Sequence, residues 1–147
     1  MIDSYTIDQR LKNKIIDHEG LKTTLYKDSL GNLTIGVGHL LEPSKGGKIS
    51  INASMFILGE DLAGAHSQLI KYSWFNQLDD IRQGMLIEMC FNIGMHGVLE
   101  FTDMIKSIVK QDYYQASLDF LNSREAHQIK SERADDMAYR LRFGQYK

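Results

Sequence analysis

The sequence has little of what would interrupt, cross-link or anchor a chain. Its one proline is Pro43, so helices elsewhere are free of the ring that removes a backbone hydrogen bond. Its one cysteine, Cys90, cannot form an internal disulfide, and it lies in an apolar run where we expect a buried thiol. No segment approaches the ~20 apolar residues of a membrane span. We therefore expect a globular chain that does not insert into a membrane.

An excess of positive charge is also missing. The chain has 17 Lys and Arg against 19 Asp and Glu, which gives a formal net charge of −2. Because nucleic-acid-binding proteins usually carry a basic face, this balance argues against a nucleic-acid partner. It also mildly disfavours binding to an anionic cell wall, so any attraction to such a surface must come from a local patch.

No secretion signal is visible. The first twenty residues carry charges from Asp3 onward and contain no apolar stretch long enough for the core of a signal peptide. We therefore expect the protein to be made and folded in the cytoplasm. Its 147 residues, 43% hydrophobic and 24% charged, predict one ordinary folded domain, 1–147.

The N-terminal third is predicted to form a helix followed by a β-hairpin. Residues 23–27 and 33–38 are rich in strand formers, and turn residues at 28–32 join them. The preceding helix is expected to end near Gly20. Its apolar positions recur at helical spacing and are Ile7, Leu11, Ile15 and Ile16.

The second strand has an unusual face. Thr34, Gly36 and Gly38 alternate with apolar residues and therefore lie on the same side of the strand. The glycines either only permit the small sheet to bend or, as we favour, form the floor of a cleft that a ligand can approach closely.

A long helix is predicted to connect two lobes. Ser50 is a suitable N-cap, and the helical pattern continues to about Tyr72. Trp74 and Phe75, just after its end, are expected to begin the core of the second lobe. The residues assigned to the apolar face of the long helix are Phe56, Leu62, Leu69 and Ile70.

The C-terminal half is predicted to be a cluster of helices around one that is apolar on nearly every side. This central helix covers residues 81–93 and is expected to end at Gly94 and Gly97. Shorter helices are predicted at 101–109 and 113–121. A last helix, at 132–142, is expected to bury its apolar residues and to hold three basic ones outside, namely Arg133, Arg140 and Arg142.

Together these elements predict an α+β fold that is mainly helical. A small N-terminal lobe, at about 15–60, would carry the hairpin sheet. A connecting helix at about 50–72 would join it to a helical C-terminal lobe at about 73–147, with the first helix packed on that lobe.

Two carboxylates mark the junction of the first helix and the hairpin. Glu19 lies at the end of the helix, and Asp28, nine residues later, lies at the rim of the hairpin. Enzymes that cut glycosidic bonds use one carboxyl group as proton donor and a second carboxylate on the other side of the sugar. Taken alone, Glu19 is more typical of a solvated helix end than of a catalytic acid, and an Asp at the position of Asp28 is common in turns.

The segment HEG-x5-YKD-x5-TIGVGHLL, which contains both acids, closely resembles the catalytic signature of the phage T4-type lysozymes, glycoside hydrolase family 24. A second match is Phe91-Asn-Ile-Gly94 with Gly97, and a third, weaker one begins at Arg133. The resemblance implies a lysozyme-like fold without a cofactor. It also implies hydrolysis of the β-1,4 bond between N-acetylmuramic acid and N-acetylglucosamine in peptidoglycan.

The resemblance assigns three catalytic roles. Glu19 would be the general acid that protonates the leaving oxygen, Asp28 would hold the attacking water or stabilise developing positive charge, and Thr34 would orient that water. It favours inversion of configuration, which predicts a carboxylate separation of ~6.5–9.5 Å; a gap near ~5 Å would favour a retaining route.

Further residues near the site follow from the same resemblance. His39 would pair with Asp61 on the connecting helix, and because no second ligand stands at a suitable spacing, no metal is expected. Arg133 would hold the two lobes in register. The positions expected to contact substrate are Gly38, Leu40, Phe91 and Asn92.

Glu88 departs from the pattern of that family, which has an amide at this position. It lies one turn before Asn92 on the same helix face. Two interpretations are open: a buried ion-pair partner, which we favour, or a third acid in the cleft.

Three classes of function are consistent with these residues. The first is a phage endolysin, a monomer released to the cell wall in the periplasm through a holin-type pore. The second is a lysozyme domain in an antibacterial effector or a tail-associated machine. The third, a non-catalytic module that binds peptidoglycan, would be expected to lack Glu19 or Asp28, yet both are present with Thr34.

Overall fold

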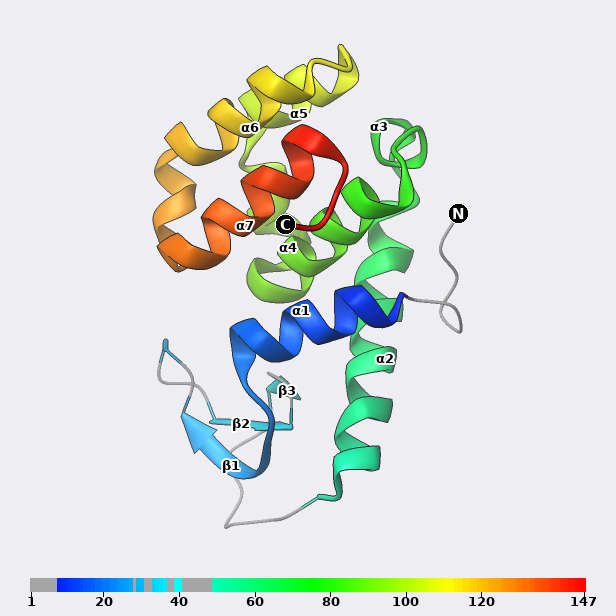
Figure 1. The fold of residues 1–147 in the computed structure, drawn as a ribbon, viewed down its shortest axis with the longest axis vertical. Helices are drawn as coiled ribbons and strands as arrows, with labels where there is room; N and C mark the ends of the chain where they lie inside the picture. Colours follow the sequence, from blue (N-terminus) through cyan, green and yellow to red (C-terminus); the bar gives the residue numbers. More distant parts are fainter. Residues whose placement is uncertain (1–7, 28, 31–32, 37–38, 41–48) are drawn as a thin grey trace. The chain divides into compact units, whose positions relative to one another are not determined.

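The computed structural model describes residues 8–27, 29–30, 33–36, 39–40 and 49–147, with the backbone alone for most strand residues (Figure 1). The chain divides into two compact units, Ile2–Gly64 and Ala65–Lys147, and the boundary falls inside one long helix. The predicted mainly helical character is confirmed. The predicted packing of the first helix on the C-terminal lobe stays a prediction.

The N-terminal unit begins with α1, Gln9–Glu19. Asp8 caps this helix, because its carboxylate accepts a hydrogen bond from the backbone N–H of Arg10 at 2.8 Å. The helix ends where Gly20 adopts φ 75°, a left-handed value that a residue with a side chain would take only under strain. The predicted first helix is confirmed, and Leu11 and Ile15 are buried as expected.

A three-stranded antiparallel sheet follows α1 in the order β1-β2-β3. Strands β1, Lys22–Lys27, and β2, Leu33–Gly36, occupy the two segments in which strands were predicted. The third strand, β3, is the dipeptide His39–Leu40, which is too short to give an alternating pattern in the sequence and was not predicted.

The long connecting helix is α2, Ile51–Leu69. Ser50 caps it, since its hydroxyl accepts from the N–H of Ala53 at 3.0 Å. Phe56 and Ile70, which were expected on its apolar face, are 70% and 38% exposed. The buried stripe follows steps of three and four along the helix, and Phe56 lies half a turn away from it. The buried residues are Ser54, Leu58, Leu62, Ala65, His66 and Leu69.

The C-terminal unit is a cluster of helices around α4, Asp80–Leu99 (Figure 1). Every residue from 83 to 90 is buried, which confirms the predicted central helix. Helix α7 packs on α4, and α6 packs on both α5 and α7. The other elements are α3, Ser73–Asn76; α5, Thr102–Val109; α6, Tyr113–Asn122; the 3₁₀ helix η1, Arg124–Gln128; and α7, Ser131–Phe143.

Aromatic and sulfur-containing side chains fill the centre of this unit. Phe101 and Phe120 stack with ring centroids 5.5 Å apart and are at most 1% exposed. Phe75 is fully buried, as predicted, while Trp74 is half-buried. Cys90 is 4% exposed, which confirms the predicted buried thiol. Burial raises the pKa of this thiol to about 11.

The two glycines expected to end the central helix behave differently. At Gly94 the backbone leaves the helical region with φ 77° and ψ 163°, so the first helical segment ends there. Gly97 lies buried inside a short helical continuation that runs to Leu99, so the prediction that it ends the helix is wrong. A Cβ at Gly97 would lie 3.0 Å from the side chain of Ile93, which accounts for a small residue at this position.

Candidate active site

Glu19 occupies the last position of α1, where its side chain is half-buried. The following residue, Gly20, donates its N–H to the carbonyl of Ile16 at 2.7 Å and turns the chain out of the helix. A Cβ at Gly20 would meet no atom within 4 Å, so the glycine is required by the backbone conformation and not by lack of space. The end of α1 therefore fixes the point from which Glu19 projects.

Thr34 lies in the central strand of the sheet and is only 1% exposed. The strand register places the backbone of Tyr26 on one side of it and that of Leu40 on the other. Asp28, the predicted second carboxylate, and Gly38, a predicted substrate contact, lie outside the described residues. The Glu19–Asp28 separation, and with it the choice between inversion and retention, stays a prediction.

His39 and Asp61 were expected to form an ion pair. The backbone of His39 lies in β3 opposite Ile35, but its side chain lies outside the described part. Asp61 is half-buried on α2. Their pairing stays a prediction.

Phe91 and Asn92 are half-buried in the last turn of α4 before the break at Gly94. Within the described residues, the Oδ1 atom of Asn92 is buried and has no hydrogen-bond partner. A buried acceptor of this kind is costly unless it finds a donor in a water or a ligand. This is compatible with the predicted role of Asn92 as a substrate contact, which stays a prediction.

Glu88 is fully buried and lies between two arginines of α7. Its Oε1 accepts from Nε of Arg133 at 3.0 Å, and its Oε2 accepts from Nη2 of Arg140. The same nitrogen of Arg140 lies 3.1 Å from the carboxylate of Asp136. The favoured interpretation of Glu88 as a buried ion-pair partner is confirmed.

The burial of the two arginines overturns part of the sequence interpretation. Arg133 is 7% exposed and Arg140 is 0% exposed, although both were expected outside. Two guanidinium groups buried beside Glu88 and Asp136 give a cluster with no formal net charge, which lowers the cost of taking these ions out of water. Arg133 is thus held within the C-terminal unit by Glu88; its predicted role between the lobes stays a prediction.

Arg140 and Asp136 were not singled out by sequence reasoning. A usable signal was present, because Arg133 and Arg140 are seven residues apart and therefore share one face of a helix. Asp136 lies four residues before Arg140 on that face, a spacing at which opposite charges meet. A buried helix face that contains two cations predicts a buried acid on a neighbouring helix. Glu88, inside the apolar central helix, is such an acid.

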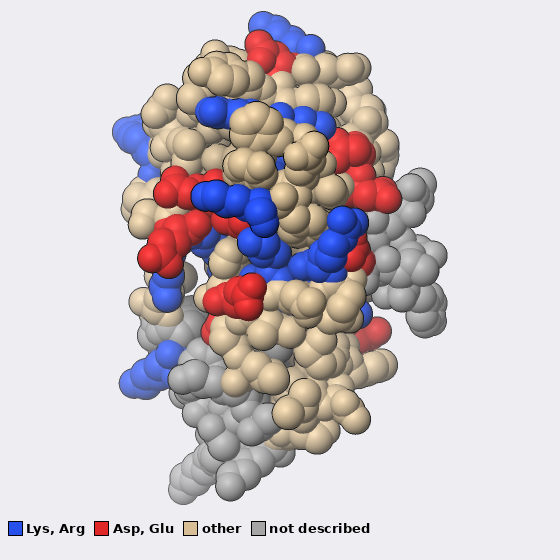
Figure 2. Space-filling view, in the orientation of Figure 1, with Lys and Arg blue, Asp and Glu red and all other residues tan. Residues whose placement is uncertain are grey.

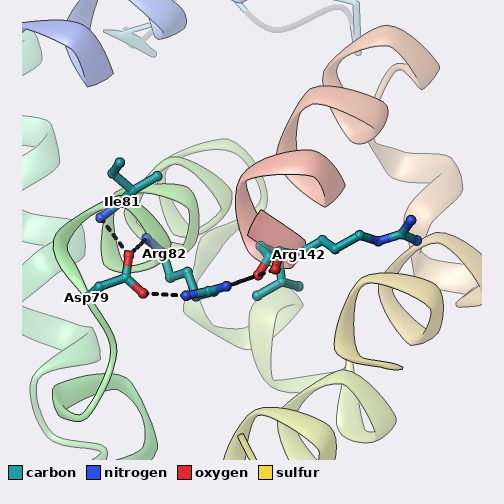
Figure 3. A network of polar contacts seen from close by, with 5 residues as sticks. Asp79, Ile81, Arg82 and Arg142 are labelled. Atoms are coloured by element: carbon teal, nitrogen blue, oxygen red, sulfur yellow. Dashed lines mark hydrogen bonds and ion pairs between the residues drawn. The ribbon is translucent and has the colours of Figure 1, made fainter. Parts of the chain in front are cut away.

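A second polar network holds the end of α7 to the start of α4 (Figure 3). Asp79 caps α4 and pairs with Arg82 at 2.8 Å. Arg82 donates in turn to the carbonyls of Leu141 and Arg142, at 2.7 and 2.8 Å. These carbonyls belong to the last turn of α7, where helix geometry leaves them without an intrahelical donor. Arg82 also lies over the ring of Tyr113, with its Cζ 3.8 Å from the ring centroid.

Two other kinds of feature are missing from the described part of the chain. No three His, Cys, Asp or Glu side chains converge there as ligands for a metal ion. No helix in the same residues is both long enough and apolar enough to cross a bilayer.

Comparison with known proteins gives one family and similar relatives. A family model described as Phage lysozyme matches residues 16–134, a segment that contains Glu19, Asp28 and Thr34. "Probable T4-type lysozyme 1" of Dictyostelium discoideum is 28% identical over 145 residues, covering 80% of this chain and 85% of that protein. "Probable T4-type lysozyme 2" of the same organism is 28% identical over 140 residues, covering 77% and 82%.

Proposed function

Because the chain belongs to the phage lysozyme family, we propose that it hydrolyses the β-1,4 bond between N-acetylmuramic acid and N-acetylglucosamine in peptidoglycan. The observation that carries this proposal is the spacing of Glu19, Asp28 and Thr34 inside the matched segment. The positions of Glu19 at the end of α1 and of Thr34 in the adjoining sheet support it, since each side chain projects from a regular element.

In this mechanism Glu19 donates its proton to the glycosidic oxygen as the bond from that oxygen to the anomeric carbon breaks. A water attacks the anomeric carbon from the opposite side of the sugar. Asp28 accepts a proton from that water, and Thr34 orients it through the hydroxyl group. Two sugar hydroxyl ends result, and a proton transfer through solvent restores both carboxyl groups. A Thr34 hydroxyl shielded from bulk solvent suits the placement of a single water.

We propose lysis of a bacterial host at the end of phage infection as the biological role, with synthesis in the cytoplasm and release to the wall through a holin-type pore. An antibacterial lysozyme outside a phage life cycle is the second candidate. It is favoured by the two relatives from Dictyostelium discoideum, because these T4-type lysozymes belong to a cellular organism and not to a phage. A tail-associated muramidase is a further alternative.

Product analysis tests the reaction. Purified protein is incubated with Gram-negative peptidoglycan, and the new ends are identified by mass spectrometry after borohydride reduction. Reducing N-acetylmuramic ends are expected. Anhydro-muramic ends would indicate a lytic transglycosylase, and new free amines would indicate an amidase or peptidase; either result contradicts the proposal.

Four variants at three residues test the roles. Glu19→Gln keeps the shape of the side chain and removes the transferable proton, so activity should fall roughly 10²–10⁴-fold or more. Asp28→Asn should cause a comparable loss. Thr34→Ala should lower kcat more than Thr34→Ser, because Ser retains the hydroxyl. Full activity in Glu19→Gln would end this account of the chemistry.

A further inference from the structure

The protein carries an overall negative charge, yet its proposed substrate is an anionic polymer, so attraction requires a local basic surface. On the face shown in Figure 2, Lys and Arg side chains are interspersed with Asp and Glu and with uncharged surface. One hollow in the C-terminal unit combines cations with aromatic rings. It has a volume of about 160 Å³ and lies between α6 and α7 and the last residue of the chain. Its lining residues are Leu121, Asp135, Ala138, Tyr139, Arg142, Phe143 and Lys147.

The hollow lies on the face of α7 away from the buried arginines. Asp135, Tyr139 and Arg142 recur at spacings of four and three, which places them in one row along the helix. That row is offset from the row of Arg133 and Arg140, which points into the protein. One face of α7 therefore completes the core, and the other forms the wall of the hollow.

An exposed ring, that of Phe143, and a half-buried ring, that of Tyr139, form an aromatic platform in the hollow. Tyr139 and Phe143 lie one helical turn apart, with ring centroids 4.8 Å apart and planes tilted by 51°. Phe143 is 52% exposed, so about half of this side chain is open to a ligand. Rings set at this angle offer an apolar corner, against which the apolar face of a sugar ring or an N-acetyl methyl group can pack.

Two cations flank the platform. The ammonium of Lys147 lies 5.9 Å from the ring centroid of Tyr139, and Cζ of Arg142 lies 5.9 Å from that of Phe143. Nε of Arg142 donates to Ser117 at 2.9 Å, and its Cζ lies 4.5 Å from the ring of Tyr114. In Figure 3 the side chain of Arg142 points away from Arg82, toward the neighbouring helix. The guanidinium is thus fixed in place, and its two terminal nitrogens have no acceptor among the described residues.

We propose that this hollow is a second, non-catalytic binding site for a peptidoglycan strand. An N-acetylated sugar would lie on the platform of Tyr139 and Phe143. Arg142 and Lys147 would bind carboxylates of the attached stem peptide, and Asp135 would accept from sugar hydroxyls or a stem-peptide amine. The charge of the two cations complements that of the polymer, whereas the chain as a whole does not. The inference rests on the proposed activity toward peptidoglycan and explains how a protein of net charge −2 stays on its substrate.

The test measures retention on insoluble peptidoglycan without cleavage. Sedimentation with purified sacculi is carried out in a Glu19→Gln background, and the variant under test carries Phe143→Ala and Lys147→Ala as well. The matched control carries Phe56→Ala and Lys110→Ala, which remove one exposed phenyl and one exposed ammonium elsewhere. Binding of the test variant should be roughly fivefold weaker or more, with the control close to the background protein. Urea unfolding verifies that both variants are folded.

Several outcomes would overturn the inference. Equal binding of test and control variants would show that the hollow takes no part. Equal binding of the background protein to chitin, which has N-acetylated sugars but no carboxylates, would remove the role of the cations. A dimer in light scattering that becomes a monomer in the test variant would make the hollow a contact between two copies. Cleavage by the unmodified protein is assayed separately, so failure of the proposed reaction is distinguishable from failure of this site.

Discussion

Replacement of Glu88 by Gln removes one charge from a fully buried cluster and changes little else in shape. Glu88 is 0% exposed and accepts hydrogen bonds from Arg133 and Arg140. With Gln in its place, Arg133 and Arg140 would lose the carboxylate to which both donate, while the pair of Arg140 with Asp136 would remain. The cluster of Glu88, Arg133, Asp136 and Arg140 would then carry one more positive charge than it does now. Removing one charged partner of a buried ion pair typically lowers the free energy of unfolding by about 3–5 kcal/mol.

For a chain of this size, about 1 kcal/mol shifts the melting temperature by roughly 2–4 °C, so Glu88→Gln should lower it by roughly 6–20 °C. Urea unfolding followed by the fluorescence of Trp74, the one tryptophan, reports directly on the unit that contains the cluster. The matched control is Glu100→Gln. It makes the same chemical change at a 45% exposed side chain that pairs with His96, and it should cost less than about 1 kcal/mol.

The outcome separates the two interpretations of Glu88. A buried structural acid predicts loss of stability, with catalytic activity retained well below the melting temperature. An acid that takes part in cleavage predicts lost activity with normal stability. Equal unfolding free energies for Glu88→Gln and Glu100→Gln would refute the reasoning from burial.

Three further predictions follow from local contacts. Gly144→Ala should lower the free energy of unfolding by about 2 kcal/mol, as measured in urea, because φ is 62° at this residue and a new Cβ would lie 2.8 Å from Nη1 of Arg82. Unchanged stability would show that the Arg82 guanidinium moves aside freely. Asp8→Ala should cost about 1 kcal/mol at neutral pH through loss of the cap of α1. Because the hydrogen bond from Arg10 lowers the pKa of Asp8, this contribution is present above the ordinary carboxyl pKa and is lost as pH falls through the lowered value, so wild type and variant should converge in acid. Cys90 should resist a thiol reagent at pH 8 until the protein unfolds, since with a pKa of about 11 only roughly a thousandth is thiolate; rapid labelling of folded protein would contradict its burial. The raised pKa also predicts a pH dependence of stability. The contribution of the buried neutral thiol is fully present below about pH 9 and is lost as pH rises through about 11.

Features that depend on a few neighbouring residues were readable from the sequence. The end of α1 at Gly20, the cap of α2 at Ser50 and the break of α4 at Gly94 each follow from one residue's backbone preference or hydrogen-bonding group. The central helix was recognisable because it is apolar on nearly all sides, which only a fully buried helix can be. The candidate catalytic residues came from spacing and resemblance, which are also properties of the sequence alone.

Features that depend on distant residues were decided by the tertiary structure. Arg133 and Arg140 look like surface residues in the sequence, but Glu88, 45 and 52 positions away, compensates their charge in the interior. Arg82 likewise binds α7 carbonyls 59 and 60 residues away. A charged side chain is exposed by default because ions are costly to bury, and a buried partner of opposite charge offsets part of that cost. The sequence by itself therefore determined the longer helices and most of their ends, while packing between helices determined which polar groups lie inside.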